Sequence, residues 1–287
     1  MTAAPDDASR DGAQRELDRF HALRARHVTG ARGPLALVQT QWVDHEQTVW
    51  GVAGSWAPAP GGLPGLQVTA TAADGLEFDG EPVDGTVLVA PDTAVVPGMV
   101  RFSPTSTGTV VTSDDGTSSA LRVWDADSEG VRGFGSISAW PHDPSWVVVA
   151  DWVPTPEGTR VDVRHQADPG LSRPKPLPGL IRFEREGRSY ELAAFPAGDG
   201  DRLQLVFGDA TNGAGEGTDG SYAVGRFLFP TPSDDGTITL DLNRAVLPPC
   251  AFSYAFNCPV PPPQNRLDLA VEAGERHVLG RDGRPLH

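Results

Sequence analysis

Residues 179–195 read GLIRFEREGRSYELAAF, and their pattern decides the fold. Apolar residues alternate with charged or polar ones along both halves of this stretch, as in a strand that buries one face. Glu186 and Gly187 separate the halves, and a glycine between two alternating runs is typical of a tight hairpin turn. The stretch therefore predicts two antiparallel strands that are joined at Glu186-Gly187.

Short runs of the same kind lie on both sides of this hairpin. They are rich in Val, Thr or Trp and are bounded by Gly, Pro or Asp, as expected for strands joined by tight turns. They cover residues 35–43, 48–56, 65–72, 85–90, 96–102, 108–113, 119–124, 146–153, 202–207, 221–229, 236–242 and 266–273. Because these runs do not alternate with helices, they predict an all-β fold, mainly antiparallel and sandwich-like or barrel-like, as one body or two fused lobes.

The beginning of the chain has a different pattern. Residues 1–12 are polar and are predicted to form a disordered tail. In residues 13–30, Leu17, Phe20 and Leu23 recur at helical intervals, which predicts one amphipathic helix that packs against the main body. The expected division of the remainder is a Trp-rich first lobe, 31–165, a proline-rich connection, 166–179, and a second lobe, 180–287.

The charge of the chain limits its partners. A formal charge of −15 over 287 residues disfavours nucleic acid and anionic membranes, which bind through clustered Lys and Arg. The N-terminus lacks the basic and apolar regions of a signal peptide, and no later run is apolar enough to span a membrane. We therefore expect a cytoplasmic protein, in which Cys250 and Cys258 stay reduced.

Metal and cofactor motifs are weak in this sequence. Cys250 and Cys258 are separated by seven residues without a second ligand pair nearby, and the histidines show no zinc-binding spacing. Residues 209–220 begin like a calcium loop but end in Gly220 where a glutamate is needed. The glycines of the same stretch precede a strand, whereas a dinucleotide loop precedes a helix. We expect neither a metal nor a cofactor.

Polar residues gather on the predicted strands of the second half. If residues 221–229 form a strand, Tyr222 and Arg226 point to one face. Asp241 and Asn243 share a face of the next strand in the same way. Such a set could bind a carboxylate or phosphate through Arg226, or it could be an internal network that compensates a buried arginine. Both interpretations remain open at this stage.

Seven stretches of the chain stand out as motifs: PLALVQTQWVD, WPHDPSWVVVADWV, LVFGDATNG, SYAVGRFLF, DLNRAVLPPCAF, NCPVPPPQNRL and AVEAGE. Together they resemble an uncharacterised bacterial family, domain of unknown function 1684. The resemblance covers most of the chain after about residue 20 and is most specific in the C-terminal third. It implies a fold and a set of motif positions, and it names no reaction. Those positions are Asp209, Thr211, Tyr222, Gly225, Arg226, Asp241, Asn243, Pro248, Pro249, Cys250, Cys258, Pro259, Asn265, Glu272, Gly274 and Glu275.

These observations lead to one main functional hypothesis and two alternatives. The main hypothesis is a small-molecule-binding β-protein whose polar pocket is centred on Arg226. The candidate ligand-binding residues are Asp209, Tyr222, Arg226, Asp241, Asn243, Cys250, Cys258, Asn265 and Glu272. The first alternative is a cofactor-independent hydrolase, lyase or isomerase that uses Asp241, Glu272 or a cysteine as base or nucleophile. The second is an interaction protein with exposed tryptophans in its first half.

The segment 248–267 contains both cysteines within a frame of prolines. Proline fixes φ and lowers the entropy lost on ordering, while Phe252, Tyr254 and Phe256 can attach the segment to the β-body. Free cysteine usually packs as a small apolar residue, although a catalytic or redox role is also open. We expect the segment to form a rigid wall of the pocket around Arg226.

Overall fold

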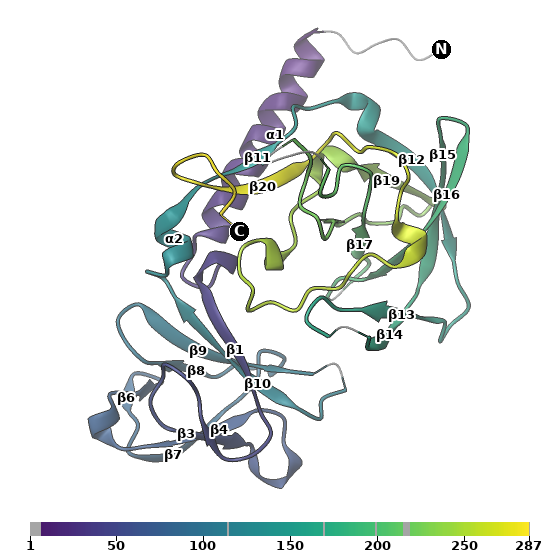
Figure 1. Ribbon diagram of the computed structural model, residues 1–287. Helices are drawn as coiled ribbons and strands as arrows, with labels where there is room; N and C mark the ends of the chain where they lie inside the picture. Colours follow the sequence, from purple (N-terminus) through teal and green to yellow (C-terminus); the bar gives the residue numbers. More distant parts are fainter. Residues whose placement is uncertain (1–6, 114, 169, 199, 215–218, 287) are drawn as a thin grey trace. The chain divides into compact units, whose positions relative to one another are not determined.

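The computed structural model describes residues 7–113, 115–168, 170–198, 200–214 and 219–286. The chain forms two units, one made of Met1–Arg26 with Phe134–His287 and the other of His27–Gly133 (Figure 1). All strand pairs between the named strands are antiparallel in the part of the chain that the structure describes. The predicted all-β antiparallel fold with an N-terminal helix is thereby confirmed.

The C-terminal unit is built on a six-stranded half-barrel sheet. Its strands, in order across the sheet, are β18 (Arg226–Leu228), β17 (Leu203–Phe207), β16 (Arg188–Pro196), β15 (Gly179–Arg185), β12 (Val147–Pro154) and β19 (Thr237–Asp241). Two strand pairs complete the unit: β11 (Phe134–Ala139) with β20 (Glu275–Gly280), and β13 (Arg160–Arg164) with β14 (Ser172–Pro176). Apolar side chains are buried on both faces of the sheet in two clusters, one with Ile181, Leu205 and Phe207, and the other with Phe195, Val206 and Phe227.

The predicted hairpin is present as β15 and β16. Arg185 pairs with Arg188, and the two residues between them both have positive φ, 54° at Glu186 and 73° at Gly187. Positive φ at both central positions is the conformation of a two-residue turn that matches the twist of antiparallel strands. The alternating sequence and the glycine therefore specified this element correctly.

The N-terminal unit contains two further sheets. One has the order β1 (Leu37–Val43), β10 (Ser119–Asp125), β9 (Ser106–Thr112), β8 (Met99–Arg101), β5 (Glu77–Phe78) and β6 (Glu81–Pro82). The other has the order β2 (Gln47–Thr48), β3 (Ser55–Pro58), β4 (Leu66–Ala70) and β7 (Gly85–Val89). Trp56 is fully buried in the core of this unit, where its ring contacts Phe102 edge-on at 6.1 Å between centroids. Trp42 and Trp50 are exposed by 51% and 82%. The alternative that exposed tryptophans of this unit bind another protein stays a prediction.

Two helices have α-helical hydrogen bonding in the described residues, α1 (Asp7–Val28) and the short α2 (Glu129–Gly133). α1 begins earlier than the predicted 13–30, so residues 7–12 are helical where a disordered tail was expected, and residues 1–6 lie outside the described part. The first proline after Asp7 is Pro34, so no proline interrupts the helix before its end at Val28. Leu17 on α1 is buried, as its helical spacing indicates. No helix among the described residues combines the length and apolar character that crossing a bilayer requires.

The division of the chain differs from the expected one. Residues 134–165 belong with the C-terminal unit, whereas the prediction placed them in the first lobe. The reason is long-range pairing, because β12 lies between β15 and β19, and β11 pairs with β20 at the end of the chain. The proline-rich stretch 166–179 is therefore a connection within one unit, from β13 through β14 to β15.

Candidate functional site

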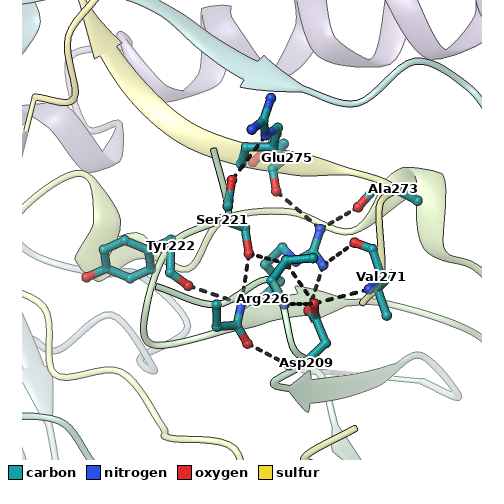
Figure 2. A network of polar contacts seen from close by, with 11 residues as sticks. Asp209, Ser221, Tyr222, Arg226, Val271, Ala273 and Glu275 are labelled. Atoms are coloured by element: carbon teal, nitrogen blue, oxygen red, sulfur yellow. Dashed lines mark hydrogen bonds and ion pairs between the residues drawn. The ribbon is translucent and has the colours of Figure 1, made fainter. Parts of the chain in front are cut away.

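Arg226 begins strand β18 and is completely buried. Its Nη2 atom donates to Oδ2 of Asp209 at 2.7 Å and to the carbonyl oxygen of Val271 at 2.8 Å. Its Nη1 atom donates to the carbonyl oxygens of Ala273 and Glu275. Figure 2 shows the guanidinium directed at these backbone groups, with Asp209 beneath it.

The carboxylate of Asp209 is equally enclosed. Its Oδ1 atom accepts hydrogen bonds from the backbone and hydroxyl of Thr211 at 2.9 and 2.6 Å, and from the backbone N–H of Val271 at 3.2 Å. The Thr211 hydroxyl also contacts the Ser221 hydroxyl at 2.7 Å. A buried ion pair needs such additional hydrogen bonds to offset the loss of hydration. The arrangement is that of a structural pair whose partners are all provided by the protein.

Two aromatic rings lie near the guanidinium carbon of Arg226, Trp140 at 5.1 Å and Phe207 at 5.4 Å to the ring centroids. Burial lowers the pKa of Arg226, and the adjacent Asp209 acts in the opposite direction by favouring the charged form. Of the three guanidinium nitrogens, Nη1 and Nη2 are hydrogen-bonded, and Nε has no partner among the described residues. A ligand carboxylate at Arg226 would have to displace Asp209, so the internal-network interpretation accounts for these contacts.

Tyr222 does not share a face with Arg226. Residues 221–225 are not part of the strand, which begins at Arg226, because Gly225 has φ of 112° and interrupts the extended backbone. Figure 2 shows the Tyr222 ring turned away from the guanidinium. The Tyr222 hydroxyl donates to the carbonyl oxygen of Cys250 at 3.2 Å. Both Cys250 and Cys258 are buried free thiols beside it.

The proline segment packs near this turn. A β-carbon at Gly225 would come within 2.9 Å of Pro261 Cγ and within 2.5 Å of the Phe207 carbonyl oxygen. Only glycine fits here, since both the positive φ and the close backbone approach exclude a side chain. The segment therefore packs over the turn before the strand that carries Arg226. It was predicted to be the wall of a ligand pocket, but the groups it covers are bound to other protein groups.

Asp241 and Asn243 form a separate cluster. Asn243 lies in a 3-10 turn directly after β19, so the predicted shared strand face does not exist. Its side chain accepts from the backbone N–H of Asp143 at 2.9 Å and donates to the Asp143 carbonyl oxygen at 3.0 Å. Asp241 accepts from Asn243 and from Nε of Arg244, at 3.0 and 3.2 Å. Asn243 thus holds the loop before β12, and Asp241 orients Asn243.

Asn265 and Glu272 lie apart from these groups. Asn265 is fully buried and binds backbone atoms of Ala193 on β16 and of Val206 on β17. Glu272 is exposed. The predicted strand 266–273 is absent. This segment instead contacts other parts of the same chain one residue at a time, as in the Gly208–Arg266 bridge and the carbonyl oxygen that accepts from Arg226. The candidate residues thus lie in four structural clusters plus one exposed carboxylate.

Glu275, which the resemblance included and the candidate site did not, anchors helix α1. It is fully buried, and its two oxygens accept from Nε and Nη2 of Arg24 at 2.8 and 3.1 Å. The backbone N–H of Leu247 is a further donor, at 2.7 Å. The position of Glu275 within AVEAGE was the only sequence signal for this ion pair, since its partner is 251 residues away.

A groove of about 500 Å³ lies elsewhere, over β12 and the β15–β16 hairpin. Its lining includes Asp151, Arg182, Glu184, Glu191, Phe183 and Tyr190. Asp151 pairs with Arg182 across β12 and β15, and Arg182 pairs with Glu191 across the hairpin. These three side chains therefore stand in one row. The sequence interpretation missed this groove, although the alternation in residues 179–195 already places Arg182 and Glu184 on one face.

Residues 132–276, about half of the chain, match the family described as Protein of unknown function (DUF1684). The chain belongs to this family. The resemblance stated from the sequence motifs is therefore confirmed over residues 132–276, whereas the early stretch PLALVQTQWVD lies outside the match. A solved structure with similarity is the solution NMR structure of an uncharacterized protein of Haloarcula marismortui, 34% identical, covering 50% of this chain and 77% of that chain, with a TM-score of 0.40. No curated protein matches the chain.

The DUF1684 region holds the whole Arg226 network, both cysteines and the groove. It also ends one residue after Glu275, whose partner Arg24 lies outside it on α1. The helix is therefore attached to the family region by a buried charge pair at the end of that region.

His21 on α1 is expected to make the stability of the protein depend on pH. Its side chain is half-buried and its Nε2 has no partner among the described residues. Burial lowers the pKa of His21 from 6.5, opposed by Glu275 and Asp18. The unfolded state therefore binds the proton of His21 more readily than the folded state. The contribution of neutral His21 to the free energy of unfolding is complete above about pH 6.5 and is lost as the pH falls below that value. We expect the urea concentration at half-unfolding to be lower at about pH 5 than at pH 7. The difference between the two pH values should be smaller in His21→Gln.

The control for this prediction is His45→Gln, because His45 is an exposed residue of the other unit. The midpoints of both variants and of the wild type are measured by fluorescence at each pH. An equal pH dependence in His21→Gln and the wild type would show that His21 does not contribute.

Proposed function

We propose that this protein binds a small organic cation in the groove over β12, β15 and β16. The observation that carries the proposal is the charge of the lining, where Asp151, Glu184 and Glu191 accompany a single guanidinium, Arg182. Arg182 already binds Glu191, with Nε 2.6 Å from Oε2. Two carboxylates are then left to attract a positive charge from solution.

The other partners of these carboxylates support this view. Glu184 accepts a hydrogen bond from the Ser189 hydroxyl at 3.2 Å, which leaves its charge uncompensated. Among the described residues, no cationic side chain lies within ion-pair distance of Asp151 or Glu184. An ammonium group between them would make charge-assisted hydrogen bonds, which are stronger than neutral ones.

The groove also offers apolar contact. Val149, which is exposed by 68%, lies among the lining residues of the groove. Phe183 and Tyr190 border the groove, but their stacked rings, with centroids 5.1 Å apart, lie on the core face of the hairpin. A small ligand with an apolar part and a positive end would match this combination of an aliphatic side chain and acidic groups.

This proposal keeps small-molecule binding but changes its place and charge. The sequence pointed to an anionic group at Arg226, whereas the contacts of Arg226 are already made by Asp209 and backbone carbonyls. The enzyme alternative with Asp241, Glu272 or a cysteine stays a prediction, as does the bacterial origin. A cytoplasmic location is part of the proposal and is supported by the two unbridged thiols, which suit a reducing compartment.

We expect a linear diamine such as 1,4-diaminobutane to bind in the groove, and the matched diol and diacid not to bind. Asp151→Asn removes one acidic group without changing the shape of the side chain. It is expected to weaken diamine binding about two- to fivefold, since an exposed charge pair contributes up to about 1 kcal/mol. Binding is measured by isothermal titration calorimetry and by backbone amide shifts at β12 and β15.

Asp162→Asn is the matched control, because it removes the same charge from an exposed site on β13. This variant should bind the diamine like the wild type. Equal binding of diamine, diol and diacid, or unchanged diamine binding in Asp151→Asn, would contradict the proposed site.

A further inference from the structure

Cys250 and Cys258 lie together under the proline segment. They are exposed by only 1% and 4%. The backbone N–H of Cys250 donates to Sγ of Cys258 at 3.2 Å, so the second sulfur lies directly beside the first cysteine. A disulfide requires the two sulfurs at about 2.05 Å, and the position of the Cys258 sulfur against the Cys250 backbone makes this pairing the one to test.

Tyr222 completes this cluster. Its hydroxyl donates to the carbonyl oxygen of Cys250 at 3.2 Å and also lies within hydrogen-bond reach of the Cys250 thiol. The hydrogen bond from Cys258 lowers the pKa of Cys250, and the one from Tyr222 lowers it further, against burial, which raises it. Burial and the neighbouring Cys250 raise the pKa of Tyr222, so its hydroxyl keeps its proton and remains a donor. The neighbouring Cys258 and Tyr222 therefore favour the thiolate of Cys250.

The chain between the two cysteines contains several local hydrogen bonds. The backbone N–H groups of Ala251 and Phe252 donate to Pro248 and Pro249, and that of Phe256 donates to Ser253. The second cysteine is fixed separately, since its carbonyl oxygen accepts from the backbone N–H of Gln166 at 2.9 Å. Tyr254, at the middle of this segment, is exposed by 73%. Local opening of the segment can therefore admit a small oxidant without separating the two anchored ends.

We propose that Cys250 and Cys258 form a reversible disulfide when the protein meets a hydroperoxide. The Cys250 thiolate attacks the peroxide oxygen, the O–O bond breaks, and the products are a sulfenic acid and one water, or one alcohol from an alkyl peroxide. The Cys258 thiolate then attacks the sulfenic sulfur, the S–O bond breaks, and a second water leaves with the proton. The two thiols together lose two electrons and two protons, which the peroxide takes up.

The experiment compares intact masses and thiol counts of the native protein before and after hydrogen peroxide. We expect a loss of about 2 Da, no remaining thiol after denaturation, and a peptide map that joins Cys250 to Cys258. Dithiothreitol should restore both thiols. Two thiols that survive until urea is added, a sulfinic acid without a disulfide, or a disulfide between two molecules would each overturn the proposal.

Single variants test the order of the steps. Cys258→Ser removes the second thiol, so the sulfenic acid at Cys250 should persist and react with dimedone. Cys250→Ser should give little dimedone adduct, and equal labelling of both variants would contradict the assigned roles. The wild-type peptide map needs no variant and remains decisive if either substitution prevents folding.

Tyr222→Phe tests the contribution of the hydroxyl while keeping the ring. Loss of one hydrogen bond to the Cys250 thiolate should slow peroxide oxidation at neutral pH by about two- to tenfold. It should also move the pH dependence of Cys250 oxidation to higher pH, which a purely structural role of the tyrosine would not do. An unchanged pH dependence would show that the hydroxyl does not act on the thiol.

Discussion

Replacing Arg226 with methionine is expected to lower the free energy of unfolding by about 3–5 kcal/mol, the usual effect of breaking a buried ion pair. Methionine has a similar length and no charge, so the substitution leaves the Asp209 carboxylate in a fully enclosed site without its counter-ion. The carbonyl oxygens of Val271 and Ala273 lose their donor at the same time. The size of the effect follows from the burial of both partners, whose side chains are 0% exposed.

Urea unfolding followed by circular dichroism measures this change. Asp209→Asn alone should also destabilise the protein, because Arg226 then becomes the uncompensated charge. The double variant Arg226→Met with Asp209→Asn should lose less than the sum of the single losses, since it leaves no buried charge unpaired.

Arg182→Met is the matched control for this prediction. Arg182 is about half exposed and forms its ion pair with Glu191 at the surface, where such pairs contribute at most about 1 kcal/mol. A loss at Arg226 as small as that at Arg182 would mean that water enters and replaces the guanidinium. In that case a solvent-connected site at Arg226 would have to be considered again.

The elements that the sequence predicted correctly are those with local signals. The β15–β16 hairpin has a strict alternation and a turn that requires positive φ at Glu186 and Gly187, and both are visible within seventeen residues. α1 likewise follows from its apolar spacing around Leu17. Each of these elements depends on residues that are neighbours in the chain, so the pattern alone is sufficient.

The candidate site could not be predicted in the same way, because its contacts are not local. The face argument for Tyr222 and Arg226 required a continuous strand, and Gly225 interrupts it. The carbonyl oxygens that bind Arg226 come from residues 271–275, which adopt an irregular path that no alternation indicates. Residues of the right chemical types were identified, but their partners depend on a backbone path that only the structure gives.

The role of Asn265 shows the same limit and leads to the second large effect. In the part of the chain that the structure describes, the register of β16 and β17 consists of Phe195–Gln204 and Pro196–Leu203. Further along, the Asn265 amide lies between them: its Oδ1 accepts from the Ala193 N–H at 2.7 Å, and its Nδ2 donates to the carbonyl oxygens of Ala193 and Val206, both at 2.8 Å. The Asn265 side chain thus makes the hydrogen bonds to β16 and β17 that a paired strand residue would make, at a point beyond the paired residues of these two strands.

Asn265→Ala is therefore expected to lower the free energy of unfolding by about 3 kcal/mol or more. The substitution leaves three buried backbone groups without partners, and each unsatisfied group costs about 1–3 kcal/mol. Asn257→Ala is the control, because Asn257 is exposed although its side chain also makes two hydrogen bonds, to Ala167 and Asp168. We expect that variant to lose no more than about 1 kcal/mol.

Two measurements distinguish this role from a general packing defect. Hydrogen exchange should show that the Ala193 amide loses protection in Asn265→Ala, while amides in the β12–β15 ladder keep theirs until global unfolding. Asn265→Asp keeps the acceptor for Ala193 but directs a carboxylate oxygen at two carbonyl oxygens, so it should be destabilised most at neutral pH. Its loss should become smaller as pH falls, because a buried carboxyl has a raised pKa and its protonated form again donates a hydrogen bond. A loss in Asn265→Asp that does not change with pH would show that the Nδ2 contacts contribute little, and that β16 and β17 are joined by packing.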